Sequence, residues 1–369
     1  MEVAFILSLD PMTSGGGIRT YVKHLSKYLS DLGHKVTLIS PKNNREQSKL
    51  KYIPIGSNSP NNLVFVIKLF LKVINLSISD SAILCGNRAD FIFPFIFLKK
   101  RGYKCLIIHG NQYSAVKEKS EIMYRLFSIV EKYTMKRIDY IVYVGIESKR
   151  NNENRFKEHI DKVPSTIIPV GVDTNLFNII DKDRSYNEIG LPKGKKIIMS
   201  VGRLNKEKRY DIAIESIYLL SKKRQDFRYY IIGDGPEKGN IASLIQKYGL
   251  EETIFTLGLV EYEKIPLFLN CADVFLLTSD RENGPIVLKE AMATGCPVVS
   301  TEVGDAGHII KKNNGILAPC GDIKGIAAAL MSSLNLRWNR MEIRSSCEKY
   351  DWKIISDKFE KDVINHFNN

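Results

Sequence analysis

The sequence has few of the residues that mark several protein classes. Its 369 residues include six cysteines, six histidines and two tryptophans, and the cysteines form no CxxC pair. A disulfide framework and a zinc site are therefore not indicated, and a reducing cytosol is the expected compartment. The first apolar run is too short for a signal peptide and has no basic start, so export is not expected.

Long apolar runs are also missing. The longest, residues 63–78 and 91–98, are interrupted by Lys68, Lys72 and Pro94. Neither reaches the ~20 apolar residues that span a bilayer. We expect buried or half-buried helices there, with partial insertion into a membrane surface as the alternative.

The net charge is positive and is unevenly distributed along the chain. With 44% hydrophobic and 26% charged residues the chain is typical of folded proteins, and its length favours two domains. The net charge is +13, from 54 basic and 41 acidic side chains. Residues 1–180 hold 26 basic and 15 acidic side chains, a surplus of 11, against 28 and 26 in the remainder. The first half should therefore attract polyanions such as nucleic acid, an anionic membrane or a phosphorylated substrate.

Short apolar strands alternate with amphipathic helices in both halves, which predicts an α/β fold of two doubly wound parallel sheets. Residues 170–195 contain turn formers and charges without periodicity, as in a linker. Two such domains would enclose a cleft, a common place for a ligand. The strands expected before and after that linker span residues 3–9, 36–40, 82–85, 105–109, 140–144, 166–169, 197–201, 229–232, 254–257, 274–277 and 297–300.

The segment 281–300 carries the strongest motif. Gly284 suits a helix cap and Pro285 the first helical position, while Gly295 ends the helix. The free N–H groups of that helix start make an anion site suited to a diphosphate, beside Glu282. Glu290, further into the helix, could accept bonds from both ribose hydroxyls. The alternative is a pair of exposed glutamates.

A second motif, residues 201–211, follows a predicted strand. Arg203 and Lys208 would project from the carboxyl end of that strand, where two fixed cations suit a departing diphosphate. A solvated basic loop is the alternative. The tight turn at residues 233–236, Gly-Asp-Gly-Pro, is by itself only weak evidence for a functional site.

Two N-terminal features are looser. Residues 14–17, Ser-Gly-Gly-Gly, look like a phosphate-approaching turn but lack the Lys-Ser/Thr of a P-loop and the spacing of a dinucleotide fingerprint. His109 ends an apolar strand before Gly110 and could point toward a ligand, or it could be a structural histidine.

Together these motifs resemble the retaining glycosyltransferases of family four, of the bacterial surface-polysaccharide type, over nearly the whole chain. The resemblance implies a GT-B fold, with an acceptor-binding Rossmann-like domain at 1–175 and a nucleotide-sugar-binding one at 176–351. It also implies that a last helix, within 352–369, returns to the first domain. The implied reaction is metal-independent transfer with retention, and no cofactor is implied.

The resemblance also assigns roles to residues. Arg203 and Lys208 would neutralise the donor diphosphate, and Glu290 would hold its ribose. Glu282 would bind the transferred sugar, and His109 would contact that sugar and help place the acceptor. The backbone positions that would bind the donor are Gly16, Gly17, Gly284, Pro285, Ile286 and Val287.

The sequence departs from the family pattern at three positions. Asn283 replaces the usual aromatic residue, Lys289 stands where an apolar residue or proline is common, and His308 replaces a frequent acidic residue. These departures leave the donor base and sugar open, but they remove no residue assigned to the diphosphate.

The leading hypothesis is transfer of a hexose or N-acetylhexosamine from a UDP or GDP sugar to a saccharide acceptor. The basic first half favours a polyprenyl-diphosphate-linked acceptor at the cytoplasmic membrane face, as in bacterial O-antigen or capsule assembly. The amphipathic segment 117–137 could bind that surface peripherally, or it could pack on the core. The alternatives are a non-hydrolysing nucleotide-sugar epimerase and an inactive partner protein; no nucleic-acid-binding signature is present.

Overall fold

The protein is described here by a computed structural model covering residues 1–12, 16–41, 50–56, 62–99, 102–110, 120–282 and 284–368. It divides into two compact units, each described by itself. Unit 1 comprises Met1–Gly171 and Trp352–Asn369, and unit 2 comprises Val172–Asp351. The sequence placed this boundary after residue 175.

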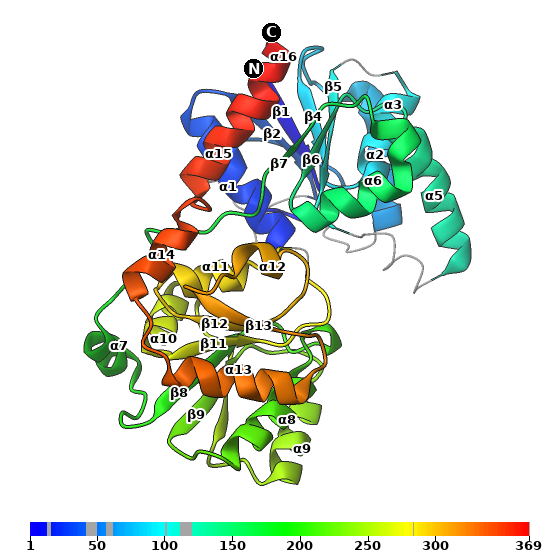
Figure 1. The fold of residues 1–369 in the computed structure, drawn as a ribbon. Helices are drawn as coiled ribbons and strands as arrows, with labels where there is room; N and C mark the ends of the chain where they lie inside the picture. Colours follow the sequence, from blue (N-terminus) through cyan, green and yellow to red (C-terminus); the bar gives the residue numbers. More distant parts are fainter. Residues whose placement is uncertain are drawn as a thin grey trace. The chain divides into compact units, whose positions relative to one another are not determined.

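Unit 1 is built on a seven-stranded, all-parallel sheet of order β3-β2-β1-β4-β5-β6-β7 (Figure 1). Its strands are β1 Glu2–Ile6, β2 Lys35–Ser40, β3 Lys51–Pro54, β4 Ile83–Gly86, β5 Tyr103–Ile108, β6 Tyr140–Tyr143 and β7 Ser165–Ile167. Its helical segments are α1 Gly17–Asp31, α2 Asn62–Lys72, η1 Val73–Asn75, α3 Ala89–Phe97, α5 Glu121–Met135, α6 Ile146–Ile160, α15 Trp352–Phe359, the π-helical η4 Glu360–Ile364 and α16 Asn365–Asn368.

The end of the chain belongs to unit 1 because α15 packs against α1. Trp352 stacks on His24 with ring centroids 4.6 Å apart and meets Tyr21 edge-on at 6.0 Å. A Cβ on Gly171 would lie only 2.6 Å from the Trp352 ring, so glycine is required for that approach. The last helix is not uniform, since a π-helical turn interrupts it at Glu360–Ile364.

Unit 2 is a six-stranded parallel sheet of order β10-β9-β8-β11-β12-β13. Its strands are β8 Lys196–Val201, β9 Phe227–Ile232, β10 Ile254–Gly258, β11 Val274–Leu277, β12 Val298–Thr301 and β13 Gly315–Ala318. Its helical segments are α7 Lys182–Ile189, η2 Lys206–Lys208, α8 Tyr210–Ser221, α9 Lys238–Tyr248, η3 Tyr262–Lys264, α10 Ile265–Cys271, α11 Ile286–Ala293, α12 Ala306–Ile309, α13 Ile323–Asn335 and α14 Arg340–Glu348.

Both predicted doubly wound sheets are confirmed. In unit 1 the strand order reverses beside β1, and in unit 2 beside β8. Ligands of open α/β sheets bind beyond the carboxyl ends of strands at such a reversal. The loops after β1 and β4 in unit 1, and after β8 and β11 in unit 2, flank these reversals and are therefore the places to look for a site.

One expectation about local structure is wrong, and two strands were missed. Residues 170–195 are not simply a linker, because they contain helix α7. The Asp181 side chain accepts from the Arg184 N–H at the start of α7, and Gly190 ends it with φ +67°. Two edge strands, β3 and β13, were not predicted; each has only four residues and too little alternation to be recognised.

The two long apolar runs are helices α2 and α3, and Pro94 is tolerated inside α3. Their inner faces are buried, with Phe65, Leu69 and Phe95 in the core of unit 1. The outer face of α2 is different, because Ile67 and Leu71 are 53% and 74% exposed. In the ranges that the structure describes, no helix has the length and apolar character needed to span a bilayer.

Candidate functional site

In unit 2 the loop that follows β8 is shaped by the loop that follows β9. The N–H of Leu204 donates to the carbonyl of Asp234, and the N–H of Glu237 donates to that of Leu204. A Cβ on Gly233 would lie 1.9 Å from the carbonyl oxygen of Gly202, which only glycine avoids. The glycine turn that was weak evidence alone thus holds the loop that carries Arg203.

Lys208 and Glu282 form an ion pair at the carboxyl edge of the unit 2 sheet. The Nζ–Oε1 distance is 2.5 Å, and both side chains are largely shielded from solvent. The Ser279 hydroxyl donates to the same carboxylate oxygen at 2.8 Å. Thr278 hydrogen-bonds the carbonyls of Lys208 and Arg209, which fixes the basic loop to the end of β11. The second motif is therefore not merely a solvated basic loop.

Arg203 lies in the same loop and is exposed. No ion pair within the described ranges includes it. Arg209 is bound instead: its guanidinium meets Asp211 at 3.0 Å and Asp280 at 2.8 Å, which raises its pKa further above the ordinary value. Arg209 therefore braces the loop, while Arg203 projects into solvent.

Helix α11 begins one residue later than predicted. Its first residue is Ile286, and Pro285 is the N-cap with φ −66° and ψ 96°, so Gly284 lies before the cap. Proline fits here because its fixed φ is compatible with the cap and it has no N–H to satisfy. The N–H groups of Ile286 and Val287 lie in the first turn, where a helix offers donors to an anion.

Glu290 is not an exposed glutamate, because only 5% of it is accessible. Tyr262 donates to its Oε1 at 2.8 Å. Burial raises the Glu290 pKa to about 7, against the opposing effects of Tyr262 and the nearby Lys208 charge. Lys208 thus pairs with Glu282, and its charge also acts on Glu290, which can change charge near neutral pH.

Lys289, a departure from the family pattern, points into the core of unit 2. It is 1% exposed, and its Nζ lies 4.4 Å from the centroid of the Tyr350 ring. Burial lowers its pKa to about 8. The ordinary, unfolded value is higher, so between the two values the unfolded chain binds more protons and stability rises with pH.

Lys289→Met should therefore raise the melting temperature at pH 7.5. Between pH 7.5 and 9.5 the melting temperature of the variant should increase less than that of the wild type. Methionine retains most of the apolar stem and removes the buried charge. Thermal unfolding at several pH values measures this. Lys349→Met is the matched control, because Lys349 also faces the Tyr350 ring, at 5.2 Å, but is exposed. The prediction would be contradicted if the melting temperature of the wild type increased with pH no more than that of the Lys289 variant.

In unit 1, Gly16 and Gly17 open helix α1. Gly16 is the N-cap with φ +89° and ψ 134°, a conformation that favours glycine. Gly17 is helical, and a Cβ there would meet no described atom within 4 Å. Packing in the described part of the chain therefore does not require glycine at 17.

Gly17→Ala should keep or raise the stability of unit 1, by up to about 1 kcal/mol, because alanine favours a helix. If a ligand approaches this backbone, the same change should weaken activity on that ligand at least tenfold. Gly239→Ala in α9 is the matched control, since Gly239 is also helical with open space around it. Unchanged activity of the Gly17 variant would remove Gly17 from the site.

His109 follows β5 and is 6% exposed. Its Nε2 lies 2.5 Å from Oδ1 of Asn87, and its ring meets Tyr21 edge-on at 5.2 Å. Burial lowers its pKa to about 3, so the ring is neutral near pH 7. Since Asn87 Oδ1 only accepts, Nε2 carries the proton and Nδ1 is left as an acceptor.

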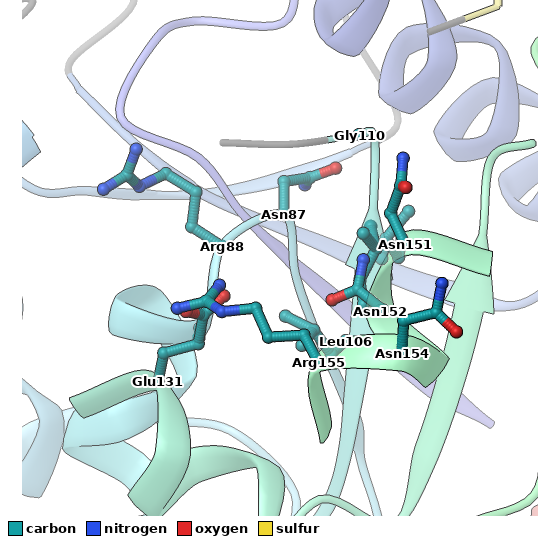
Figure 2. A pocket seen from close by; sticks show the side chains of 12 residues that line it. Asn87, Arg88, Leu106, Gly110, Glu131, Asn151, Asn152, Asn154 and Arg155 are labelled. Carbon is teal, nitrogen blue, oxygen red and sulfur yellow. The ribbon is translucent and has the colours of Figure 1, made fainter. Parts of the chain in front are cut away.

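A cavity of about 270 Å³ lies at the carboxyl ends of β4 and β5 (Figure 2). Ile108 and Gly110 line it, whereas His109 between them does not. Polar side chains from the loop after β4 and from helices α5 and α6 line it. Glu131 of α5 pairs there with Arg155 of α6 at 2.6 Å, and burial raises the Glu131 pKa to about 6. The residues that line the cavity are Asn87, Arg88, Ala89, Leu106, Ile107, Ile108, Gly110, Glu131, Asn151, Asn152, Asn154 and Arg155.

The predicted residues thus fall into two groups. Lys208, Glu282 and Glu290 come together in unit 2, with Arg203 and the start of α11 on the same sheet edge. Gly16, Gly17 and His109 belong to unit 1. Ser14, Gly15, Asn283 and residues 117–119 lie outside the described residues.

Several residues of these sites were not predicted. In unit 2 they are Tyr262, Thr278, Ser279 and Arg209; in unit 1 they are Asn87 and the lining of the cavity. Asn87 directly follows β4, which was a usable signal. No sequence signal pointed to Tyr262, because it reaches Glu290 from a different loop. Among the described residues, no three of His, Cys, Asp or Glu gather as a metal site would require.

The fold and these sheet-edge sites define the class: two Rossmann-like units, as in GT-B glycosyltransferases. Solved structures agree. Sucrose-phosphate synthase from Thermosynechococcus elongatus aligns with TM-score 0.78 and 20% identity over 100% of this chain and 99% of its own. Anabaena HepE in complex with UDP and glucose aligns with TM-score 0.76 and 16% identity over 99% of this chain and 100% of its own.

The sequence comparisons give the family. Residues 181–351 match Glycosyl transferases group 1, and residues 15–176 match Glycosyltransferase Family 4. The chain therefore belongs to glycosyltransferase family four, as the motifs predicted.

Two curated relatives have names from bacterial polysaccharide biosynthesis. The amylovoran biosynthesis glycosyltransferase AmsK of Erwinia amylovora is 34% identical over 44% of this chain and 40% of its own. The putative colanic acid biosynthesis glycosyltransferase WcaL of Escherichia coli is 33% identical over 53% and 48%. The matched region thus spans less than half the length of these relatives.

Proposed function

We propose that this chain is a retaining glycosyltransferase that moves a hexose or N-acetylhexosamine from a UDP or GDP sugar to a saccharide acceptor. The observation that carries the proposal is the arrangement in unit 2, where Lys208 pairs with Glu282 before the start of α11 and the buried Glu290 lies within that helix. A fixed cation, a helix N-terminus and two carboxylates match the diphosphate, ribose and sugar hydroxyls of such a donor.

In this proposal each donor part has a separate partner. Arg203, Lys208 and the first N–H groups of α11 bind the diphosphate, and Glu290 accepts the ribose hydroxyls. Glu282 accepts hydroxyls of the transferred sugar, and its ion pair with Lys208 then opens or is shared with the phosphate. UDP is bound by a structural neighbour of the same fold, which supports this class of donor.

The proposed step breaks the bond between the sugar C1 and the diphosphate oxygen, and the electron pair goes to that oxygen. The acceptor hydroxyl attacks C1 from the face that the diphosphate leaves, so the configuration is retained. Its proton passes to the leaving phosphate. Lys208 and Arg203 stabilise the charge that grows on the diphosphate, and with them we propose that the reaction needs no metal.

Unit 1 would bind the acceptor. Neutral His109 offers Nδ1 as a hydrogen-bond acceptor. The cavity at the ends of β4 and β5, which His109 does not line, offers amides, arginines and the Glu131 carboxyl (Figure 2). Donors and acceptors mixed in this way suit the hydroxyls of a sugar. Gly16 and Gly17 would let the backbone approach the donor.

We further propose that the acceptor is a saccharide on a polyprenyl diphosphate, in bacterial O-antigen or capsule assembly at the cytoplasmic membrane face. The basic surplus of residues 1–180 and the names of AmsK and WcaL support this pathway. Contact with the membrane would be peripheral.

The test is transfer from a panel of UDP and GDP sugars to a short lipid-linked saccharide, with and without EDTA. We expect one donor to be used, EDTA to have no effect, and NMR to show that the anomeric configuration is retained. An inverted anomeric configuration would overturn the proposed retention, and loss of transfer in EDTA would overturn the proposed metal independence. A sugar isomerised without an acceptor would favour the epimerase, and no nucleotide binding would favour the inactive partner.

A further inference from the structure

Two helices of unit 1 expose apolar stripes to solvent. On α2 and η1 the stripe is Ile67, Leu71 and Ile74, which are 53%, 74% and 67% exposed. On α5 it is Ile122, Leu126 and Ile129, which are 73%, 55% and 67% exposed. Spacings of three and four residues place each set on one face of its helix. Each helix also has a separate buried face, with Leu69 in α2 and Phe127 in α5.

A row of aromatic rings joins the two stripes across α3, which packs against both helices (Figure 1). Phe70 of α2 lies 5.6 Å from Phe97, and Phe97 lies 5.5 Å from Phe93. Phe93 meets Tyr133 of α5 edge-on at 5.6 Å. Phe97 is itself 53% exposed. The stripes and this row therefore form one apolar surface, which we call the α2–α5 face.

The helices that carry the two stripes are basic. Residues 62–75 and 120–137 contain six basic residues and two acidic ones. Of the acidic ones, Glu131 turns into the cavity toward Arg155, and Glu121 pairs with Arg125 at 3.4 Å. The basic residues are Lys68, Lys72, Arg125, Lys132, Lys136 and Arg137.

We infer that the α2–α5 face binds the surface of an anionic lipid bilayer, with its isoleucines and leucines among the acyl chains and its cations at the headgroups. An apolar stripe on a basic helix is the pattern of a helix lying in a membrane interface. A second copy of the chain fits less well, since pairing two such faces would bring twelve cations together, six from each. The choice of occupant rests on the lipid-linked acceptor of the proposed function.

The apolar residues of the segment predicted at 117–137 as amphipathic lie on two faces of α5. Phe127 is buried against the core, and the outer stripe is Ile122, Leu126 and Ile129. Helix α2, which was expected to be buried or half-buried, supplies half of the face.

The test is co-sedimentation of the full chain with vesicles of phosphatidylcholine alone and with added phosphatidylglycerol. We expect binding to the anionic vesicles, weakened by high salt, and at least tenfold weaker binding of the double variant Leu71→Glu/Ile129→Glu. Leu259→Glu is the matched control, because Leu259 is an exposed leucine of unit 2, at 80%, and its change should leave binding intact. Melting curves check that the double variant is folded.

Equal binding of wild type and double variant, or no binding of the wild type, would overturn the inference. A wild-type dimer that the double variant converts to monomer, with no vesicle binding, would assign the face to a second copy instead. Transfer to a water-soluble acceptor should persist in the double variant. Vesicle binding without any transfer would contradict the proposed function while leaving this face assigned to the membrane.

Discussion

Lys208→Met should lower kcat for sugar transfer by about 10²- to 10³-fold, the usual effect of removing one preorganised charge from a developing anion. The substitution keeps the length of the side chain and removes its charge. The Nζ of Lys208 already lies 2.5 Å from Glu282 and is held by a loop tied to Thr278, so its position is set before the ligand binds. Steady-state transfer with a saturating donor measures the change.

Lys206→Met is the matched control, because Lys206 lies in the same short turn but is exposed. Its kcat should remain within about twofold of wild type. A Lys208 variant that loses donor affinity but keeps kcat would mean that Lys208 binds the ground state only. An equal loss in both variants would point instead to the general charge of the loop.

The site in unit 2 was predictable where its chemistry is local in the sequence. Arg203 and Lys208 follow a strand, and Glu282 and Glu290 bracket a helix start, so the parallel-sheet rule alone brings them to one edge. Their mutual contacts were not predictable. Tyr262 reaches Glu290 from η3, and Ser279 reaches Glu282 from the end of β11. Such pairs depend on loop conformation, which no spacing of apolar residues encodes.

In unit 1 less of the site could be predicted. Three asparagines of α6 and Glu131 of α5 have the sequence character of solvated helix faces, yet they line the cavity at β4 and β5. The same limit applied to α2, where periodicity gave the helix but its apolar residues on two faces could not be sorted into buried and exposed. Hydrophobic patterning says which face is apolar, and only the packed neighbours decide which apolar face is covered.

Glu290 should make donor affinity depend on pH. Ribose hydroxyls need the ionised carboxylate, but burial raises the Glu290 pKa to about 7 in the ligand-free protein. Below that pH a proton must leave before the donor binds, so affinity should fall about tenfold from pH 8 to pH 6. A nucleotide sugar is the right probe, because its diphosphate is esterified at both ends and does not titrate in this range. Calorimetry across this range measures the affinity.

Glu290→Gln should separate binding from stability, since its effects on the two have opposite signs. Donor affinity should drop by about 10- to 100-fold at pH 8, because charge-assisted hydrogen bonds are lost, and its pH dependence should vanish. Stability of the ligand-free protein should rise at pH 8. The folded pKa lies above the unfolded one, so the native state is stabilised below the unfolded pKa and loses that stability as pH rises through about 7. A variant that is both weaker-binding and less stable at pH 8 would show that Glu290 supports the fold through Tyr262 rather than the donor.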